Sequence, residues 1–351
     1  MDTTNDWQPL AGPYAIWERV FLRSGGVELD SILCYGRHHH QFSHNQASKA
    51  EQYGEAGICG FAGSFQAGSI APQMGRLRPG ASVTVSHRLL LSAFNSGRFW
   101  PCRYSPLEIE LTCHSNYSDF SLQGAGLSAN IAITGVQLLF DAVVLDEAVT
   151  ESFYRALMSS RVLSIPAITC WQTVQSCPPG VTSYSFSSVR AFSRLSHVWV
   201  SFRNTGSRST EFVLPCTQPA GSTGATPYLA DGNVPSCRLS IGSKQWPDPS
   251  PADTLSQHFS NVQKALGGSI PNLDRDAFKN AYTIVFDLRR VPTDPTTSIS
   301  TRSGDMLRID LGNLTAGKSP AEAGTGCTEI WLTLWAFSCV AIRESGVTLL
   351  T

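Results

Sequence analysis

A run of histidines is the part of the sequence best suited to chemistry. Histidines 38–40 are consecutive, and His44 follows four positions later. Imidazole nitrogens are good ligands for transition metals. Only Asp30 and Cys34 lie nearby as further donors, however, and the segment has the composition of a loop. We therefore expect a polar surface loop here, which could serve contacts between molecules, and no metal site.

A pair of carboxylates is the second candidate. Glu108 and Glu110 are two positions apart in a predicted strand, so both side chains project from one face. Some glycoside hydrolases with sandwich folds use closely spaced acids in this way. A similar stretch later in the chain places Arg308 and Asp310 at the equivalent positions, which is typical of a solvated face. We expect no catalysis at the two glutamates.

The remaining motifs indicate structure rather than chemistry. Residues 24–26 and 124–126 are glycine-rich but too short and wrongly placed for phosphate loops, and no G-x-S-x-G motif occurs. Cys113 and His114 are adjacent, so they face opposite ways along a strand. Four tryptophans are expected in the core rather than on a ligand platform: Trp199, Trp246, Trp331 and Trp335. The sequence thus predicts no catalytic, cofactor-binding or metal-binding residue, and no cofactor.

Composition favours a β protein with two domains. The 351 residues include 29 glycines and 20 prolines, which suits many turns. Only 15% of residues are charged and the net charge is −1, with no run of Lys or Arg. A general nucleic-acid or membrane-surface binder usually carries a basic face. The charge pattern therefore supports neither function.

Targeting signals and cysteine usage point to folding in a reducing compartment. Residues 1–11 lack the apolar segment of a secretory signal, and the longest apolar run, 330–342, is too short to span a bilayer. Ten scattered cysteines form no C-x-x-C pair, so we expect them to be reduced and buried. Without a secretory signal, the glycosylation patterns at Asn116 and Asn313 are interpreted as chance.

An internal repeat organises the chain. Residues 107–112 (LEIELT) and 307–312 (LRIDLG) share the two-residue period of a half-buried strand. Each stretch is preceded by an apolar segment, 83–91 or 282–288, and followed by another, 131–145 or 330–342, at nearly the same distance. Three strands in register predict a duplicated β domain.

Further elements follow from local patterns. We expect strands at 14–22 and 27–34, a hairpin of 83–94 and 99–113 around the turn at 95–97, and a central strand at 131–145 that is apolar on both faces. The second unit adds strands at 161–175 and 185–202. A helix is predicted from Glu147 to Met158 after an Asp146 cap, and another begins with Ser250 as its cap. Residues 35–76 are expected to be a long surface loop.

The repeat also exposes a gap. The strands at 161–175 and 185–202 precede the repeated elements of the second unit, and their counterparts in the first would fall ahead of residue 1. We therefore expect the first unit to lack its opening strands, either because another segment fills their place or because the sequence is truncated.

An ordered set of segments resembles a known family. The segments are WERVFLRSGGVELD (17–30), RFWPCRY (98–104), VRAFSRLSHVWVSF (189–202), IGSKQWP (241–247), DLRR (287–290), TRSGD (301–305) and IRESGV (342–347). Together with the strand at 107–111, they are similar to the double jelly-roll major capsid proteins of polinton-like viruses, virophages and related eukaryotic DNA viruses. The likeness covers most of residues 14–351, and the missing start is the departure from it.

The resemblance implies an all-β fold of two tandem jelly rolls with short helices in their loops. The first jelly roll is expected at residues 1–147 and the second at residues 148–351. It implies a structural, non-enzymatic subunit that forms homotrimeric, pseudo-hexagonal capsomers of an icosahedral shell. The expected partners are neighbouring capsomers, a penton and minor capsid proteins, with no sequence-specific nucleic acid and no membrane span. The expected location is the virion, after assembly inside the host cell. The alternatives are a sandwich-fold carbohydrate-binding protein or glycoside hydrolase, and a degenerate integrated capsid gene that no longer assembles.

Overall fold

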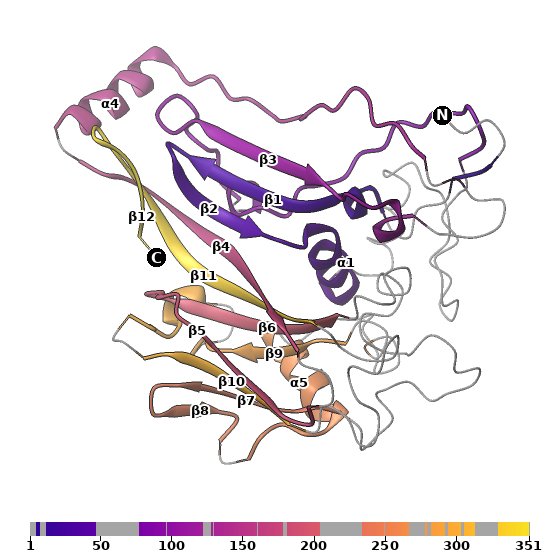
Figure 1. Ribbon diagram of the computed structural model, residues 1–351. Coiled ribbons are helices and arrows are strands. Elements are labelled where there is room, and N and C mark those ends of the chain that lie inside the picture. Colours follow the sequence, from indigo (N-terminus) through magenta and orange to yellow (C-terminus); the bar gives the residue numbers. More distant parts are fainter. Residues whose placement is uncertain are drawn as a thin grey trace.

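The structure is a computed structural model, and most of its regular elements are strands (Figure 1). It describes residues 5–7, 12–46, 77–95, 97–121, 128, 130–159, 161–177, 181–203, 234–248, 250–266, 278, 282–291, 294–302, 305–312 and 329–350. The strands are β1 (Trp17–Ser24), β2 (Val27–Ile32), β3 (Leu107–Cys113), β4 (Leu163–Ser176), β5 (Tyr184–Ser188), β6 (Leu195–Arg203), β7 (Ser236–Ile241), β8 (Lys244–Trp246), β9 (Ile284–Asp287), β10 (Leu307–Gly312), β11 (Glu329–Arg343) and β12 (Gly346–Leu350). The α-helices are α1 (Tyr35–Gln46), α3 (Ser92–Asn95), α4 (Glu147–Met158) and α5 (Leu255–Ala265). Single turns of 3-10 helix lie at Pro13–Ile16, Tyr117–Asp119 and Pro295–Thr297.

In the carboxy-terminal half of the described chain, β4 to β11 form an eight-stranded jelly roll. One layer is the part of the longer sheet with the order β4-β11-β6-β9, and the other is a separate sheet with the order β5-β10-β7-β8. Neighbours in both layers pair antiparallel. β12 folds back on the end of β11. Two four-stranded layers connected in this order form the jelly-roll sandwich.

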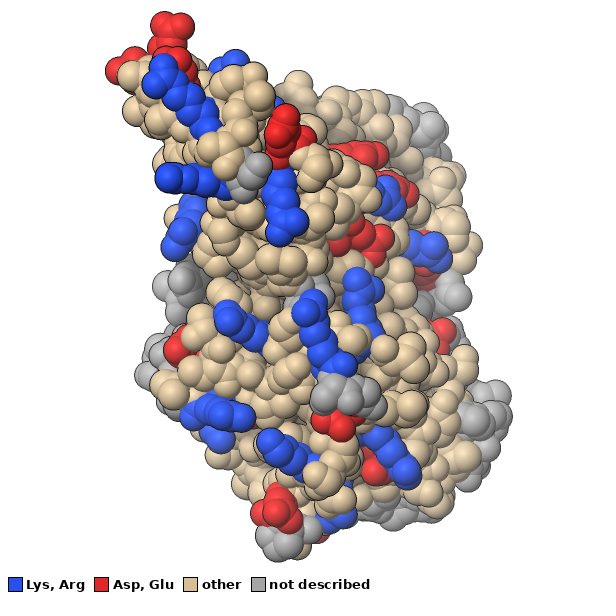
Figure 2. All heavy atoms as spheres, turned by 90° about the vertical axis from the view of Figure 1, so that its left-hand side faces the viewer, with Lys and Arg blue, Asp and Glu red and all other residues tan. Residues whose placement is uncertain are grey.

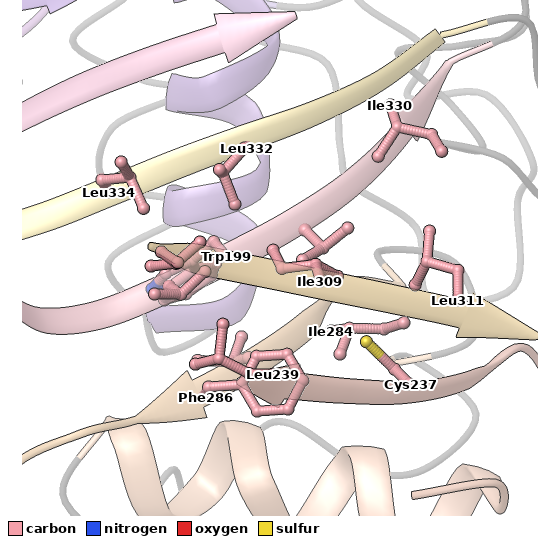
Figure 3. Packing of buried hydrophobic residues seen from close by; sticks show 14 of the residues in the cluster. Trp199, Cys237, Leu239, Ile284, Phe286, Ile309, Leu311, Ile330, Leu332 and Leu334 are labelled. Carbon is pink, nitrogen blue, oxygen red and sulfur yellow. The ribbon is translucent and has the colours of Figure 1, made fainter. Parts of the chain in front are cut away.

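The two sheets of this half enclose a dense apolar core (Figure 3). β10 alternates as expected for a strand with one buried face: Ile309 is fully buried while Arg308 is exposed. β11 is apolar on both faces because it lies between β4 and β6, and both Trp331 and Leu332 are buried. The predicted repeat strands at 307–312 and 330–342 are confirmed.

In the amino-terminal half of the described chain, the strands β3, β1 and β2 form one end of the longer sheet, in the order β3-β1-β2-β4. β1 and β2 form a hairpin whose turn residues, Gly25 and Gly26, both have positive φ, a conformation that suits glycine. The end of β2 forms a parallel bridge to β4, from Ser31 to Trp171, so this sheet continues into the carboxy-terminal half. The second apolar core also crosses between the halves, since β4 and β11 contribute Ile165 and Val340 to it.

Two of the predicted strands are wrong. Residues 81–91 and 130–145 pair with no strand of the described chain, and Asn95, expected in a turn, is the last residue of the short helix α3. A strand needs a hydrogen-bonded neighbour, and hydrophobic pattern alone does not supply one. The predicted strands at 14–22, 27–34 and 107–112 are present as β1, β2 and β3.

The two predicted helices are present, but their predicted caps need correction. α4 spans Glu147–Met158 as predicted and Asp146 is its N-cap residue, yet the Asp146 side chain makes no capping hydrogen bond. The cap of α5 is Thr254 instead of Ser250, because Thr254 and Gln257 form a reciprocal capping box. Residues 124–126 and 204–233 lie outside the described residues, as do most of the loop predicted at 35–76 and Asn313.

Candidate interaction surface

Helix α1 buries the histidines that the sequence placed on a surface loop, so that prediction is wrong. The side chains of His38, His39 and His40 are at most 9% exposed. His39 stacks on the Tyr14 ring with centroids 4.1 Å apart, and the Tyr14 hydroxyl lies 3.0 Å from Nδ1 of His40. His44 also lies in the helix. The polar composition of this segment suggested an exposed loop, but the imidazole rings are flat and partly apolar and can pack in a buried helix.

Burial keeps the imidazoles of His38 and His39 neutral. Desolvation lowers the pKa of His38 to about 4 and that of His39 to about 3, and it lowers the pKa of the neighbouring His87 to about 4. Nε2 of His39 lies 3.1 Å from the carbonyl oxygen of Arg88, so the proton of the neutral ring is on this nitrogen. Among the described residues, no group of three or more His, Cys, Asp or Glu side chains is placed to hold a metal ion.

Asp30 ties the two halves together from a fully buried position. Its carboxylate accepts hydrogen bonds from the backbone N–H of Ser92 at 2.7 Å and from that of Cys170 in β4 at 2.8 Å. Burial raises the pKa of Asp30 to about 6, against the effect of these hydrogen bonds. Alternation along β2 does not reveal this role, because Leu29 and Asp30 are neighbours and both are buried.

The two glutamates of β3 lie on a solvated face, as the sequence predicted. Glu108 and Glu110 are exposed, and Nη1 of Arg23 in β1 donates to Glu110 at 2.6 Å. The equivalent pair in β10 behaves alike, with Nε of Arg308 at 2.8 Å from Asp310. Ion pairs in solvent, between β1 and β3 in one half and along β10 in the other, explain these charges without a reaction.

The tryptophans and cysteines show where residue type is a weaker guide. Trp199 and Trp331 are buried, whereas Trp246 and Trp335 are partly buried, so the core interpretation holds with two residues at its margin. The prediction that the cysteines are buried fails for two of the described residues and is only partly met by two others. Cys170, Cys177 and Cys237 are buried, Cys34 and Cys339 are intermediate, and Cys102 and Cys113 are exposed.

The most unusual surface of the protein is apolar and lies where the sequence predicted a central strand. We call residues 130–145, together with the unpaired edge of β3, the open face. Leu139, Phe140 and Val144 are 84%, 71% and 92% exposed. Five more large apolar side chains of this stretch are also exposed: Ile133, Val136, Leu138, Val143 and Leu145. In Figure 1 the stretch runs along the top of the molecule to α4. Apolar surface of this extent is a signature of an interaction site.

Charge marks no comparable site on the face shown in Figure 2. Lys and Arg side chains are spread over it with Asp and Glu among them, and they do not merge into one basic patch. No helix in the described chain is long and apolar enough to cross a membrane.

Comparison with known proteins rests on structure. No protein-family model and no curated protein matches the sequence. The PBCV-1 virus capsid model superposes with a TM-score of 0.58 at 12% identity, covering 99% of this chain and 87% of that one. PBCV-1 VP54, fitted into a reconstruction of the virophage Sputnik, gives 0.57 at 12% identity over 100% and 91%. The Faustovirus major capsid protein gives 0.58 at 9% identity over 99% and 73%.

The fold is a double jelly roll of the viral capsid type. The similarity extends over 99% or more of the chain. It agrees with the duplicated β fold that the internal repeat predicted, although residues 83–91 and 131–145 are not strands.

Proposed function

We propose that the protein is a major capsid protein, a structural subunit of an icosahedral viral shell related to those of polinton-like viruses and virophages. The observation that carries this proposal is the structural alignment of 99% or more of the chain with the PBCV-1 virus capsid model and with PBCV-1 VP54. A duplicated roll suits a shell of hexagonal tiles, because three chains present six similar units.

We further propose that it works without catalysis or a cofactor, and that it resides in the virion after assembly in the host cell. In support, each candidate for chemistry has a structural explanation. His38 and His39 are buried and neutral, and Glu110 is paired with Arg23 on a solvated face. No observation favours the carbohydrate-active alternative.

The finer part of the proposal is a homotrimer that contacts neighbouring capsomers, a penton and minor capsid proteins. Size-exclusion chromatography with light scattering tests the trimer, which should have three times the 38.0 kDa mass of the chain. Each permanent interface should bury well over ~1,000 Å². A monomer at high protein concentration would contradict the trimer.

Electron microscopy tests the shell separately. Concentrated trimer should form hexagonal arrays or closed particles. A trimer that never associates further would leave the oligomer intact but contradict the shell.

A further inference from the structure

Helix α4 projects from the rest of the molecule at the upper left of Figure 1. Leu157 is the one residue of the helix that is buried, and the Tyr104 hydroxyl donates to the carbonyl oxygen of Thr150 at 3.2 Å. The other residues of α4 are exposed, apart from Thr150 and Ala156, which are partly buried. The helix is therefore held along one narrow side, and most of its surface is available for contacts.

One exposed side of α4 carries a line of apolar and acidic side chains. Four residues follow at intervals of four, three and four positions: Glu147, Glu151, Tyr154 and Met158. At this spacing they lie along one side of the helix, which we call the α4 face. Tyr154 is 54% exposed and Met158 is 51% exposed. Tyrosine and methionine are enriched in protein interfaces, so the α4 face has the composition of a contact surface.

The charges of this segment are ordered along the helix. Asp146, Glu147 and Glu151 lie at its start, whereas Arg155 lies in its last turn and Arg161 lies just beyond it. Nη2 of Arg155 donates to Glu151 at 2.6 Å. Neither Asp146 nor Arg161 forms an ion pair with another described residue. This order favours the helix dipole, and it also makes α4 complementary to a second copy of itself that lies antiparallel.

An antiparallel pair about a two-fold axis would make every contact twice. With the axis between Glu151 and Tyr154, the Tyr154 hydroxyl of one copy would donate to the Glu151 carboxylate of the other. Arg155 would lie near Glu151 of the other copy, and Arg161 would lie near Asp146. A parallel pair would instead place like charges against each other at both ends, which is unfavourable.

The exposed carboxylates also distinguish between classes of partner. Nucleic acids and anionic lipid surfaces attract Lys and Arg, so the acids at the start of α4 would repel both. A second copy of the chain supplies the opposite charge at each end. The antiparallel arrangement also brings together two exposed apolar residues that flank the helix, Val144 of one copy and Val162 of the other, which are 92% and 42% exposed.

We propose that α4 is a self-recognition helix, through which two copies of the chain pair antiparallel about a two-fold axis. A standard interface takes about 20 to 30 residues from each partner. α4 has 12 residues and a few flanking ones take part, so we expect a dissociation constant on the order of 10 μM. The pairing does not rest on the capsid function. If the protein forms trimers, the pairing joins one trimer to the next, because a two-fold contact cannot close a ring of three chains.

Charge variants on two sides of α4 test the pairing. In sedimentation velocity from about 1 to 200 μM, the average mass of the unsubstituted chain should rise above that of its smallest species. Met158→Glu places an acid against Glu147 of the other copy and should weaken association at least about 10-fold. Ser152→Glu is the matched control, because it adds the same charge at an exposed position on another side of α4 and should leave association unchanged. Equal weakening by the two variants would overturn the proposal.

A pair of charge reversals tests the antiparallel arrangement. Glu151→Arg and Arg155→Glu each place like charges against each other across the axis, so each variant alone should associate at least about 10-fold more weakly. In an equimolar mixture of the two variants, opposite charges face each other again, and association should return to within about 3-fold of that of the unsubstituted chain. Both residues are exposed, and circular dichroism checks that each variant is folded. A mixture that associates no better than either variant alone would overturn the proposal.

The measured masses separate this proposal from the trimer. A constant mass of three chains at all concentrations overturns the pairing and leaves the trimer intact. A dimer of single chains that Met158→Glu dissociates supports the pairing and contradicts the trimer. A constant mass of one chain overturns both.

Discussion

Strands β3 and β10 begin with nearly the same residues, and they differ in what covers them. Leu307, Ile309 and Leu311 of β10 are 2%, 0% and 2% exposed, because β11 and its neighbours form a complete sheet opposite them. The corresponding residues of β3, Leu107, Ile109 and Leu111, are only partly buried. The same sequence pattern thus contributes much more to stability in one half than in the other.

The largest expected consequence concerns the halves as separate proteins. Residues 148–351 contain all eight strands of their jelly roll and its core, so we expect this fragment to unfold in one cooperative transition. The described part of residues 1–147 contains only the three strands β1, β2 and β3 and shares a core with β4 and β11, so this fragment should not fold alone. Circular dichroism melts of the two fragments would check this. A cooperative melt of 1–147 would show that its sheet needs no covering strands.

The same aspartate substitution at equivalent positions of β3 and β10 compares how much burial each strand contributes to stability in the intact chain. Ile309→Asp places an unpaired carboxylate in a closed core and should lower the free energy of unfolding by about 4 kcal/mol or more. Ile109→Asp faces a partly open surface and should cost less than about 1.5 kcal/mol. Urea titration measures both, with Ile309→Val and Ile109→Val as size controls. Equal costs for the two aspartates would contradict the difference in covering.

Acid should weaken both halves through buried histidines. Burial lowers the pKa of His38, His39 and His87 in one half, and it lowers the pKa of His197 and His258 in the other to about 4. The unfolded chain, in which histidine has a pKa near 6.5, therefore binds more protons between about pH 6.5 and 4. Stability is full above pH 6.5 and is lost as the pH falls, by on the order of 3 kcal/mol per histidine.

Asp30 acts in the opposite direction in the amino-terminal half. Its folded pKa of about 6 lies above the unfolded value, so protonation between about pH 6 and 4 favours the folded state and offsets about one histidine. Melting temperatures from pH 7.5 to 4.5 should fall, and Asp30→Asn should make the fall steeper. A melting temperature that is constant over this range would contradict the burial of the histidines.

The sequence predicted correctly those features that depend on residues close together in the chain, and it failed for features that depend on remote contacts. Alternation in residues 307–312 and the helix after Asp146 depend on near neighbours, and both are confirmed. The burial of α1 depends on Tyr14 and His87, which are remote in sequence, and polar composition suggested the opposite. Residues 131–145 have the composition of a central strand and none of its neighbours among the described residues. The composition of a segment shows that it could form a strand, but it forms one only where a second strand is present to accept and donate its backbone hydrogen bonds.

The smallest expected effects belong to the ion pairs on the outer faces of the two strands. Arg23 and Glu110 join β1 to β3, whereas Arg308 and Asp310 lie along one strand, and all four side chains are at least 31% exposed. Solvent-exposed pairs contribute little, and salt screens them. Glu110→Gln and Asp310→Asn should each shift the melting temperature by less than about 2 °C.

Neither variant should change any activity on polysaccharides, and Glu108→Gln should not either. A polysaccharide-cleaving activity that Glu110→Gln or Glu108→Gln abolishes, while Asp310→Asn leaves it intact, would instead assign a reaction to β3 that β10 does not share.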